Sequence, residues 1–437
     1  MIESILFKDV ELITSSEHRQ GDVYVLNGKI VAIQPSLSVD TEYVVQEKGL
    51  ALIPGVIDPH VHFREPGVTH KESIYTGSKA AVRGGVTSFF EMPNTKPATI
   101  DAETLALKKE IAAQSALANY NFFIGATTSN LTELNTVENV PGIKIFVGSS
   151  TGNMLVDDPE LLIEIFKNGS RLIAVHSEDE ATIKTNIRAY QCSTDVYDHT
   201  KIRNIEAAIK STTQLVKLAN QYQRRLHICH LTTAEEAVFL EKIGSKYVTT
   251  EVTPQHLLLS SPDCYAQLGT LAQINPPIRE KRHAESLWQH LRKGTIHCIG
   301  TDHAPHTLDE KMKPFGQAPS GMPGVETSLP LLLTLAAKRQ CSYSDVVKWL
   351  CEAPAKIYKI NNKGYLKEGY DADLTLVDLK KKHKLLNKNI ISKCGWTAFD
   401  GWDCIGDVVA TFVNGQPVYR EGDFFETIKG KEIQINV

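Results

Sequence analysis

Histidine and aspartate side chains recur where apolar, strand-like runs of this sequence end. His60 and His62 close one such run, and their i, i+2 spacing on a strand would place both imidazoles on one face about 6.7 Å apart. His176, His230 and Asp302 close three later runs. Imidazole and carboxylate groups are suitable ligands for zinc and similar divalent ions. If these run ends meet in the fold, the five side chains could form a metal site.

Each of these residues also has an ordinary structural explanation. The pattern His-x-His occurs on many strands, and a single buried histidine such as His176 or His230 more often makes a hydrogen bond than a metal bond. Four histidines and one aspartate at the same end of one barrel favour a metal site over separate hydrogen-bonding roles. Barrel enzymes place their chemistry at the carboxyl ends of the strands.

The elements that would position these residues follow a regular pattern of strand-like runs separated by helix-length amphipathic segments. Eight runs occur in order: Gly55–Phe63, Val86–Pro93, Asn121–Thr127, Ile143–Gly148, Leu172–Glu178, Leu226–Thr232, Val248–Thr253 and Ile296–His303. The clearest helical segments between them are Lys71–Arg83, Ala102–Leu117, Ala234–Ile243 and Lys281–Arg292, and residues 325–358 are expected to form final helices. Eight strand–helix alternations predict an α/β fold, a (β/α)₈ TIM barrel.

The two ends of the chain have a different, β-rich pattern. Residues 4–52 alternate as short strands, and Asn27-Gly28 predicts a type I′ hairpin turn. Strand patterns return after Gly364, with a second such pair at Asn414-Gly415. We therefore expect residues 1–52 and 364–437 to form one small discontinuous β-sandwich domain, and residues 53–363 to form the barrel.

Composition is typical of a globular protein and excludes several functional classes. The 437 residues include 47 Lys and Arg against 51 Asp and Glu, a net charge of −4 that provides no general attraction for nucleic acid. The most basic run, Lys380 to Lys384, is expected to be a solvated loop. Residues 1–10 contain charged side chains instead of a signal-peptide core, and the longest apolar run, Leu329 to Ala337, is too short to cross a membrane. A cytoplasmic protein is expected.

The eight cysteines are scattered and include no CxxC pair. Such a distribution favours reduced, mostly buried thiols over a disulfide framework or a zinc knuckle.

Several motifs together resemble the amidohydrolase superfamily and, within it, the dihydroorotase family. The motifs are Asp58-Pro-His-Val-His-Phe-Arg-Glu-Pro-Gly67, Met92-Pro-Asn-Thr95, Gly142-Ile-Lys-Ile-Phe146, Val175-His-Ser-Glu178, His230-Leu, Asn275-Pro-Pro-Ile-Arg279, Thr301-Asp-His-Ala-Pro-His306 and Gly321-Met-Pro-Gly-Val-Glu326. The resemblance covers essentially the whole chain. It implies reversible conversion of N-carbamoyl-L-aspartate to dihydroorotate in pyrimidine synthesis.

The same resemblance implies two divalent ions, expected to be Zn²⁺. His60, His62, Lys144 and Asp302 would hold one ion, and Lys144, His176 and His230 the other, with a carboxylated Lys144 as the bridge.

A separate chemical argument also points to Lys144. A buried lysine readily loses its proton, and the free amine can take up CO₂ to form a carbamate that bridges two cations. The alternative is a barrel lysine paired with an acid. Some dihydroorotases have an aspartate ligand slightly beyond this position, but residues 145–152 contain no acid, and Asp157 and Asp158 are too far along.

The resemblance also implies roles in the reaction. Asp302 would take a proton from a metal-activated hydroxide and deliver it to the departing ring nitrogen, although a plain ligand role is equally compatible. Arg64, Asn94 and His306 would bind the substrate carboxylate, and the backbone around Asn275 and the loop Gly321–Gly324 are weaker candidates for holding the ring. Arg64 could instead pair with Glu65 or another acid, and Asn94 could only cap a turn. His256 and His303 are expected to be structural.

Two other functions compete with this interpretation. The first is another cyclic amidohydrolase, an allantoinase or hydantoinase, whose neutral substrate would gain little from Arg64. The second is a catalytically silent scaffold, although such relatives usually lack metal ligands. The expected partners are a small anionic substrate and, in a homodimer, a second copy of the chain, with neither nucleic acid nor membrane involved.

Overall fold

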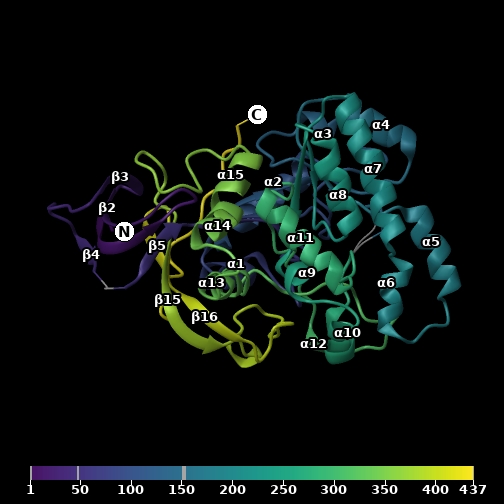
Figure 1. The fold of residues 1–437 in the computed structure, drawn as a ribbon. Coiled ribbons are helices and arrows are strands. Elements are labelled where there is room, and N and C mark those ends of the chain that lie inside the picture. The colour runs from purple at the N-terminus through teal and green to yellow at the C-terminus, as the bar shows by residue number, and fades with distance from the viewer. Residues whose placement is uncertain (1, 47–48, 150–153, 437) are drawn as a thin grey trace.

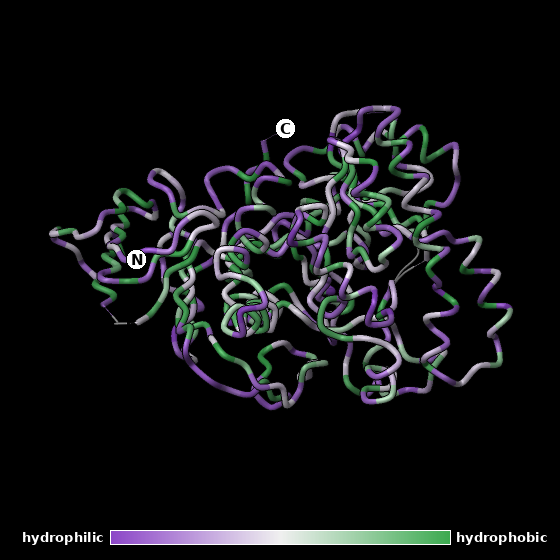
Figure 2. Tube along the Cα trace, in the orientation of Figure 1, coloured by the Kyte–Doolittle hydropathy of each residue, from purple (hydrophilic) through white to green (hydrophobic). Residues whose placement is uncertain are grey.

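The structure is a computed structural model that describes residues 2–46, 49–149 and 154–436. A closed set of parallel strands surrounded by helices forms one end of the molecule, and a sheet built from both terminal segments forms the other (Figure 1). The barrel helices carry hydrophilic and hydrophobic residues in alternation along their turns (Figure 2), as expected for helices with one face on a core and one in solvent.

All eight predicted barrel strands form, and the third is interrupted into two short pieces. Strands β6 to β8 make one parallel group and β9 to β14 the next, and a bridge between Val61 and His303 brings the end of β14 to β6. The barrel strands are β6 (Val56–Val61), β7 (Val86–Glu91), β8 (Asn119–Phe122), β9 (Ile124–Gly125), β10 (Ile143–Phe146), β11 (Ile173–His176), β12 (Leu226–Ile228), β13 (Val248–Val252) and β14 (Cys298–Ile299).

The helices follow the predicted alternation. Those within the barrel are α1 (Ile74–Arg83), α2 (Ala102–Ser115), α3 (Glu133–Thr136), α4 (Pro159–Lys167), α5 (Glu180–Ala189), α6 (His199–Ile202), α7 (Ile205–Gln221), α8 (Ala234–Ile243), α9 (Pro254–Leu258), α10 (Asp263–Leu268) and α11 (Lys281–Lys293). After β14 come α12 (Leu308–Lys311), α13 (Ser328–Ala337), α14 (Tyr343–Val347) and α15 (Ala353–Ile357), and short 3₁₀ or π segments are η1 (Val196–Asp198), η2 (Gly269–Ala272), η3 (Lys348–Glu352) and η4 (Asn387–Asn389).

Local capping explains where two of these helices begin and end. Helix α8 has the predicted capping box between Thr233 and Glu236 and ends at Gly244 with φ 56°, a left-handed conformation that favours glycine. Helix α1 begins later than the predicted Lys71, because the Ser73 side chain caps the backbone N–H of Thr76.

The two terminal segments build one nine-stranded sheet. Its order is β18-β17-β16-β15-β5-β1-β2-β3, and β4 pairs separately with β1. The strands are β1 (Ser4–Ile13), β2 (His18–Leu26), β3 (Lys29–Gln34), β4 (Tyr43–Val45), β5 (Ala51–Pro54), β15 (Leu374–Lys384), β16 (Asp403–Val413), β17 (Gln416–Arg420) and β18 (Asp423–Phe424). The predicted fold class, an α/β barrel with a β domain, is therefore confirmed, whereas the exact domain division at residues 52 and 364 stays a prediction.

Both predicted Asn-Gly hairpin turns form, and they pack against each other. Asn27, Gly28, Asn414 and Gly415 all have positive φ, as a type I′ turn requires. A β-carbon added to Gly28 would lie 2.7 Å from the Asn414 carbonyl oxygen, so this contact leaves no space for a larger residue. The Ala372 N–H donates to the Gly28 carbonyl at 2.9 Å, which ties the two turns to the start of β15.

Alternating residues of the sheet pack into two different cores. Ala51 and Ile53 of β5 belong to the core shared with the barrel, whereas Leu50 and Leu52 belong to a separate cluster within the terminal segments. This follows from the two-residue repeat of a strand, whose successive side chains point to opposite faces.

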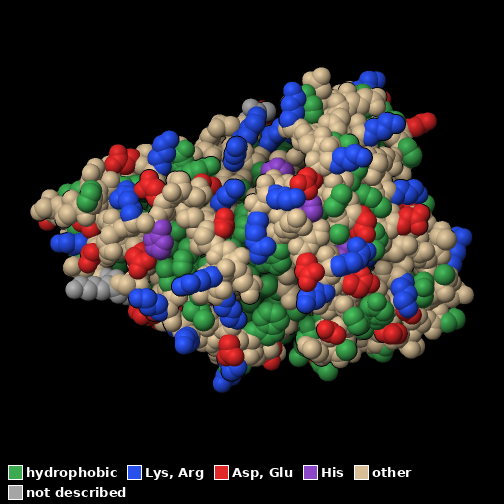
Figure 3. Space-filling view, viewed as in Figure 1, with side chains coloured by type: hydrophobic (Ala, Val, Ile, Leu, Met, Phe, Trp, Pro, Cys, Tyr) green, Lys and Arg blue, Asp and Glu red, His purple; other side chains and the backbone are tan. Residues whose placement is uncertain are grey.

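One surface prediction is wrong. Lys380 to Lys384 do not form a loop but extend β15, where Lys382 pairs with Ile405 of β16, although Lys380 and Lys382 are exposed. Cross-strand pairing with β16 holds this basic run in a strand while its lysine side chains remain in solvent. Acidic and basic side chains are interspersed over the face shown in Figure 3.

Two other predictions from composition agree with the structure. All eight cysteines are free thiols, and only Cys192 is exposed. Among the described residues, no helix combines the length and apolar character needed to cross a membrane.

Candidate active site

The predicted metal ligands gather at the carboxyl ends of the barrel strands. His60 lies in β6 with His62 directly after it, and His176 is the last residue of β11. His230 follows β12 and Asp302 follows β14. Parallel strands of a barrel share one end, so residues far apart in sequence meet there.

His60, His62 and Asp302 form the most compact part of this cluster. One carboxylate oxygen of Asp302 lies 3.3 Å from His60 Nε2 and 3.1 Å from His62 Nε2. Asp302 and His230 also have positive φ, 47° and 35°, a conformation that non-glycine residues adopt at a cost of roughly 1–3 kcal/mol. Such backbone strain is common at functional sites, where the surrounding structure holds it in place.

His176 and His230 form the second part. His176 Nδ1 faces His230 Nε2 at 3.1 Å, while the other nitrogen of His176, Nε2, lies 2.9 Å from a carboxylate oxygen of Glu178. If Nε2 donates to Glu178, the lone pair of His176 Nδ1 points at His230. Two facing imidazole nitrogens suit a shared proton or a shared cation.

Lys144 is close enough to both parts for its charge to act on His60, His176 and His230. It is fully buried on β10, and its ammonium donates to Cys229 Sγ at 3.2 Å. Within the described part of the chain, no carboxylate lies within ion-pair distance of Lys144, which removes the alternative of a lysine paired with an acid. Asp157 and Asp158 are engaged elsewhere, the first with Lys184 at 3.5 Å and the second as the cap of α4.

Electrostatics in the cluster favour a positive charge near His60. Burial alone would lower the pKa of His60, but the carboxylates of Glu251 and Asp302 raise it to about 10. Burial would raise the pKa of Asp302, yet His60 and His62 hold it well below its ordinary value, so this carboxylate is ionised. A divalent ion at His60 Nε2 would supply the same positive charge that a proton on the ring supplies.

The other histidines are held in the neutral form that metal binding requires. Burial lowers the pKa of His62 to about 3, and burial also lowers the pKa values of His176 and His230. His62 Nδ1 lies 2.8 Å from the Asn94 side-chain oxygen, so donation to that oxygen leaves His62 Nε2 as the ligand atom.

The donor set therefore fits a divalent metal ion. Ligand atoms of His60, His230 and Asp302 all lie within 4.8 Å of one another. His230 Nδ1 is buried with no hydrogen-bond partner in the described structure, and its Nε2 faces the cluster. Neutral imidazoles, an ionised carboxylate and hydrogen bonds that orient the rings are the features expected of such a site.

Sequence reasoning missed the acids that orient these histidines. Glu251 of β13 bonds His60 Nδ1, lies 3.2 Å from His227 Nε2 and accepts from the His230 backbone N–H at 3.3 Å. The one signal in the sequence was an acidic residue within a predicted barrel strand. Glu178 was part of a recognised motif, but nothing in the sequence indicated its contacts with His176 and Arg203.

We expect Glu178→Gln to weaken metal binding by about 10- to 100-fold, because glutamine loses the charge that orients His176 and pairs with Arg203. The measurement is a competitive titration of zinc against a chelator on the purified variant. Glu285→Gln, the same change at an exposed residue, is the control. An unchanged zinc affinity in Glu178→Gln would show that His176 does not depend on this carboxylate.

Arg64 and His306 lie together beside the histidine cluster. Arg64 is 5% exposed, donates from Nε to the Pro305 carbonyl at 3.1 Å and has Nη2 3.2 Å from His306 Nε2. Lys71 Nζ lies 2.9 Å from His306 Nδ1 and His306 Nε2 lies 3.1 Å from the Ser320 carbonyl. Burial, Arg64 and Lys71 hold the pKa of His306 well below its ordinary value, so the ring is neutral and donates to Ser320.

The two predicted asparagines have different surroundings. Asn94 contacts a metal-ligand candidate, His62, through its side-chain oxygen. The Asn275 side-chain oxygen lies 2.9 Å from His199 Nε2, and the described hydrogen bonds include none between Asn275 and the other predicted site residues. Contact of Asn94 with the substrate carboxylate, and of the backbone around Asn275 with the substrate ring, stay predictions. His256 and His303 have structural contacts, with the Pro276 carbonyl and the Gly324 N–H.

Comparisons with known proteins agree with this geometry. The amidohydrolase family matches residues 51–418. The chain is 34% identical to a dihydroorotase of Methanothermobacter thermautotrophicus, with 93% of this chain and 92% of that protein covered, and 33% identical to one of Pyrococcus abyssi, with 94% of each covered.

Solved structures show the same fold over the full length. An L-hydantoinase (dihydropyrimidinase) from Arthrobacter aurescens superposes with a TM-score of 0.95 at 26% identity, covering 99% of this chain and 100% of that one. A dihydropyrimidinase from Brevibacillus agri gives a TM-score of 0.92 at 25% identity, with 99% of each chain covered. The predictions of an amidohydrolase fold and of a hydrolytic enzyme are confirmed, and the chain belongs to the amidohydrolase family.

Proposed function

We propose that the protein is a dihydroorotase, which interconverts dihydroorotate and N-carbamoyl-L-aspartate with two divalent ions, expected to be zinc. One observation carries this choice among cyclic amidohydrolases. Arg64 is buried beside the metal-ligand candidates, yet no carboxylate of the described residues lies within ion-pair distance of its guanidinium. Glu65, the alternative partner, accepts instead from the Ile74 backbone N–H at 2.8 Å.

A buried, unpaired guanidinium is costly unless a ligand supplies the negative charge. The carboxylate of dihydroorotate would accept a bidentate pair of hydrogen bonds from Arg64. A neutral hydantoin or allantoin ring would leave that charge uncompensated. The relatives named dihydroorotase, at 33–34% identity, support the same choice over the hydantoinase structures at 25–26%.

The reaction would use the side chains of the cluster in defined roles. Two divalent ions held by His60, His62, Lys144, His176, His230 and Asp302 would supply an acidified water and a polarised amide carbonyl. The ionised carboxylate of Asp302 would accept the proton of the attacking water and deliver it to the departing ring nitrogen. In the reverse reaction, ring closure, Asp302 would accept a proton from the same nitrogen. Arg64 would hold the substrate carboxylate, with Asn94, Asn275 and His306 as further contacts.

We also propose that Lys144 is carboxylated. Among the residues that the structure describes, the Cys229 sulfur is the one hydrogen-bond partner of a bare ammonium in this fully buried position, and sulfur is a weak acceptor for a charged donor. A carbamate would replace that charge with two oxygen ligands, which suits two cations in one site.

The deciding experiment follows the ultraviolet absorbance of dihydroorotate on incubation with the metal-loaded protein, with hydantoin and allantoin as competing substrates. We expect turnover of dihydroorotate and little of the others. Faster turnover of hydantoin or allantoin would assign the chain to those activities. A protein that binds no metal and turns over none of the three would be a scaffold.

Arg64→Met should reduce kcat/KM for dihydroorotate by roughly 1.5–3 kcal/mol for each charge-assisted hydrogen bond lost, about 10- to 150-fold. The physical reason is that the substrate carboxylate loses its main donor while the metal ligands are untouched. Steady-state kinetics measure this effect, and Arg188→Met, at an exposed position, is the control. An unchanged kcat/KM in a folded, metal-loaded Arg64→Met protein would mean that the carboxylate is bound elsewhere.

A further inference from the structure

A pocket of about 470 Å³ opens at the end of the barrel opposite the metal-ligand candidates. Its lining residues stand where barrel strands begin: Leu172 directly precedes β11, Arg225 precedes β12 and Tyr247 precedes β13. His176 and His230 stand where two of these strands end. The chemistry proposed above therefore does not explain this pocket.

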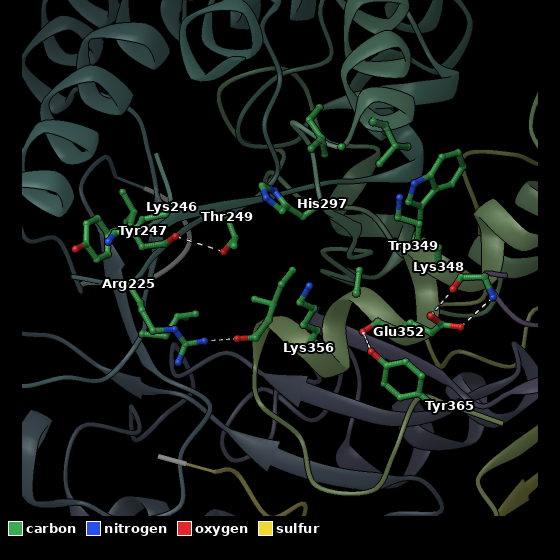
Figure 4. Close-up of a pocket in the computed structure, with 18 residues that line it drawn as sticks. Arg225, Lys246, Tyr247, Thr249, His297, Lys348, Trp349, Glu352, Lys356 and Tyr365 are labelled. Carbon is green, nitrogen blue, oxygen red and sulfur yellow. Dashed lines mark hydrogen bonds between the residues drawn. The ribbon is translucent and has the colours of Figure 1, made fainter. Parts of the chain in front are cut away.

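Four cationic side chains, Arg225, Lys246, Lys348 and Lys356, surround the pocket (Figure 4). They come from three parts of the chain: Arg225 directly precedes β12, Lys246 lies in the turn before β13, and Lys348 and Lys356 lie on the continuous helical stretch of η3 and α15. In the part of the chain that the structure describes, none of the three lysines lies within ion-pair distance of a carboxylate. Arg225 hydrogen-bonds to the Ile357 carbonyl, a neutral partner.

Negative charge in the pocket does not balance these cations. Glu352 is the one acid among the described lining residues, and its carboxylate already accepts from the Ser15 backbone N–H at 2.9 Å and from Ser15 Oγ at 2.5 Å. Burial, followed by the charges of His227, Lys356 and Lys348, lowers the pKa of His297 to about 4. Positive charge thus exceeds negative charge around this concave surface, which raises the local concentration of anions.

The deeper wall of the pocket is apolar. Among the lining residues, Tyr247, Ala353 and Tyr365 are half-buried and offer apolar surface to the pocket, whereas Leu226, Ile296 and Trp349 have almost no exposed surface. An apolar wall with a few polar groups at the rim is typical of sites for small organic ligands, and the volume lies within their usual range of about 300–1,000 Å³.

Helix ends offer a simpler explanation for part of this charge. Lys246 follows the end of α8 and Lys356 lies in the last turn of α15, where cations complement the helix dipole. That role does not account for Lys348, which begins η3, or for Arg225, which directly precedes a strand. It also does not require these four cations to meet around one cavity.

We propose that this pocket binds a nucleotide-sized organic phosphate, with the phosphate held by Lys348, Lys356 and Arg225 and a planar ring against the apolar wall. A phosphate monoester carries close to two negative charges in a small volume, which matches several cations around one cavity better than a single carboxylate does. The proposal is independent of the reaction catalysed at the other end of the barrel.

The test is isothermal titration of the metal-loaded protein at low salt with adenosine, guanosine, cytidine and uridine monophosphates, and with inorganic phosphate. We expect at least one nucleotide to bind with a stoichiometry of one per chain and more tightly than inorganic phosphate. Its affinity should fall as salt is added. The double variant Lys348→Gln/Lys356→Gln should bind it about tenfold or more weakly, because two charge-assisted contacts are lost. The unliganded variant should keep its melting temperature and its basal activity.

The matched control is Lys217→Gln/Lys388→Gln, which removes two exposed lysines away from the pocket and should leave nucleotide binding unchanged. Three results would overturn the proposal. The first is that no nucleotide binds, and the second is that both double variants lose affinity equally, as a general charge effect would produce. The third is that inorganic phosphate binds as tightly as every nucleotide, which would show that the apolar wall holds no ring.

Discussion

Lys144→Ala is expected to lose its metal and its activity together. The substitution removes the side chain that stands beside both histidine groups and would bridge the two ions as a carbamate. Without it, His60, His62 and Asp302 have no anionic link to His176 and His230. Metal content by elemental analysis and dihydroorotate turnover on the same samples measure both losses. Metal binding that survives at the wild-type level would rule out Lys144 as a ligand.

A chemical rescue separates a lost ligand from a misfolded protein. High concentrations of a short carboxylic acid should partly restore metal and activity to Lys144→Ala, because the acid can fill the vacated space and supply two oxygen ligands. Lys217→Ala, at an exposed position, should behave as wild type with or without the acid. Incorporation of isotope-labelled bicarbonate into the wild-type protein, absent from Lys144→Ala, would identify the carbamate itself.

Asp302→Asn should leave a folded and largely metal-loaded protein whose kcat is lower by about 100- to 10,000-fold, the usual contribution of general acid–base catalysis. An amide can still coordinate weakly through its oxygen, but it cannot accept the proton of the attacking water. In the native protein, His60 and His62 keep this carboxylate ionised and ready to accept that proton.

Comparing the fall in kcat with the metal content of Asp302→Asn identifies the role of Asp302. Low activity with full metal content supports the acid–base role. Low activity that follows metal loss in proportion would make Asp302 a plain ligand, the alternative left open by its contacts with His60 and His62. Asp309→Asn is the control for the chemical change.

The gathering of the metal ligands could be predicted because barrel topology does most of the positioning. Once His60, His176 and Asp302 are placed at the carboxyl ends of different parallel strands, closure of the barrel brings them to one rim. Their exact contacts could not be predicted. The bond between His60 and Glu251 joins residues 191 positions apart, and the sequence contains no periodic signal for such a pair.

The surroundings of Asn275 could not be predicted for a related reason. Its motif matched the family pattern, but the direction of its side chain depends on His199, a residue in the long connection between β11 and β12. Irregular segments of this kind have no repeat that fixes which side chains meet. The same limit applies to the terminal sheet, because the strand patterns of residues 4–52 and of the segment after Gly364 predicted β structure without giving the order of the strands.

The position of β5 between β1 and β15 has a consequence for synthesis of the chain. Pro54 of β5 pairs with Leu374 of β15, so about 320 residues must be translated after β5 before its second neighbour exists. At roughly 5–20 residues per second, that interval is about 16 to 64 s. During it, one edge of an apolar strand has no partner, and such edges recruit strands from other chains. We therefore expect slow translation or loss of the last strands to cause aggregation through β5, and a ribosome-bound chaperone to be most useful there.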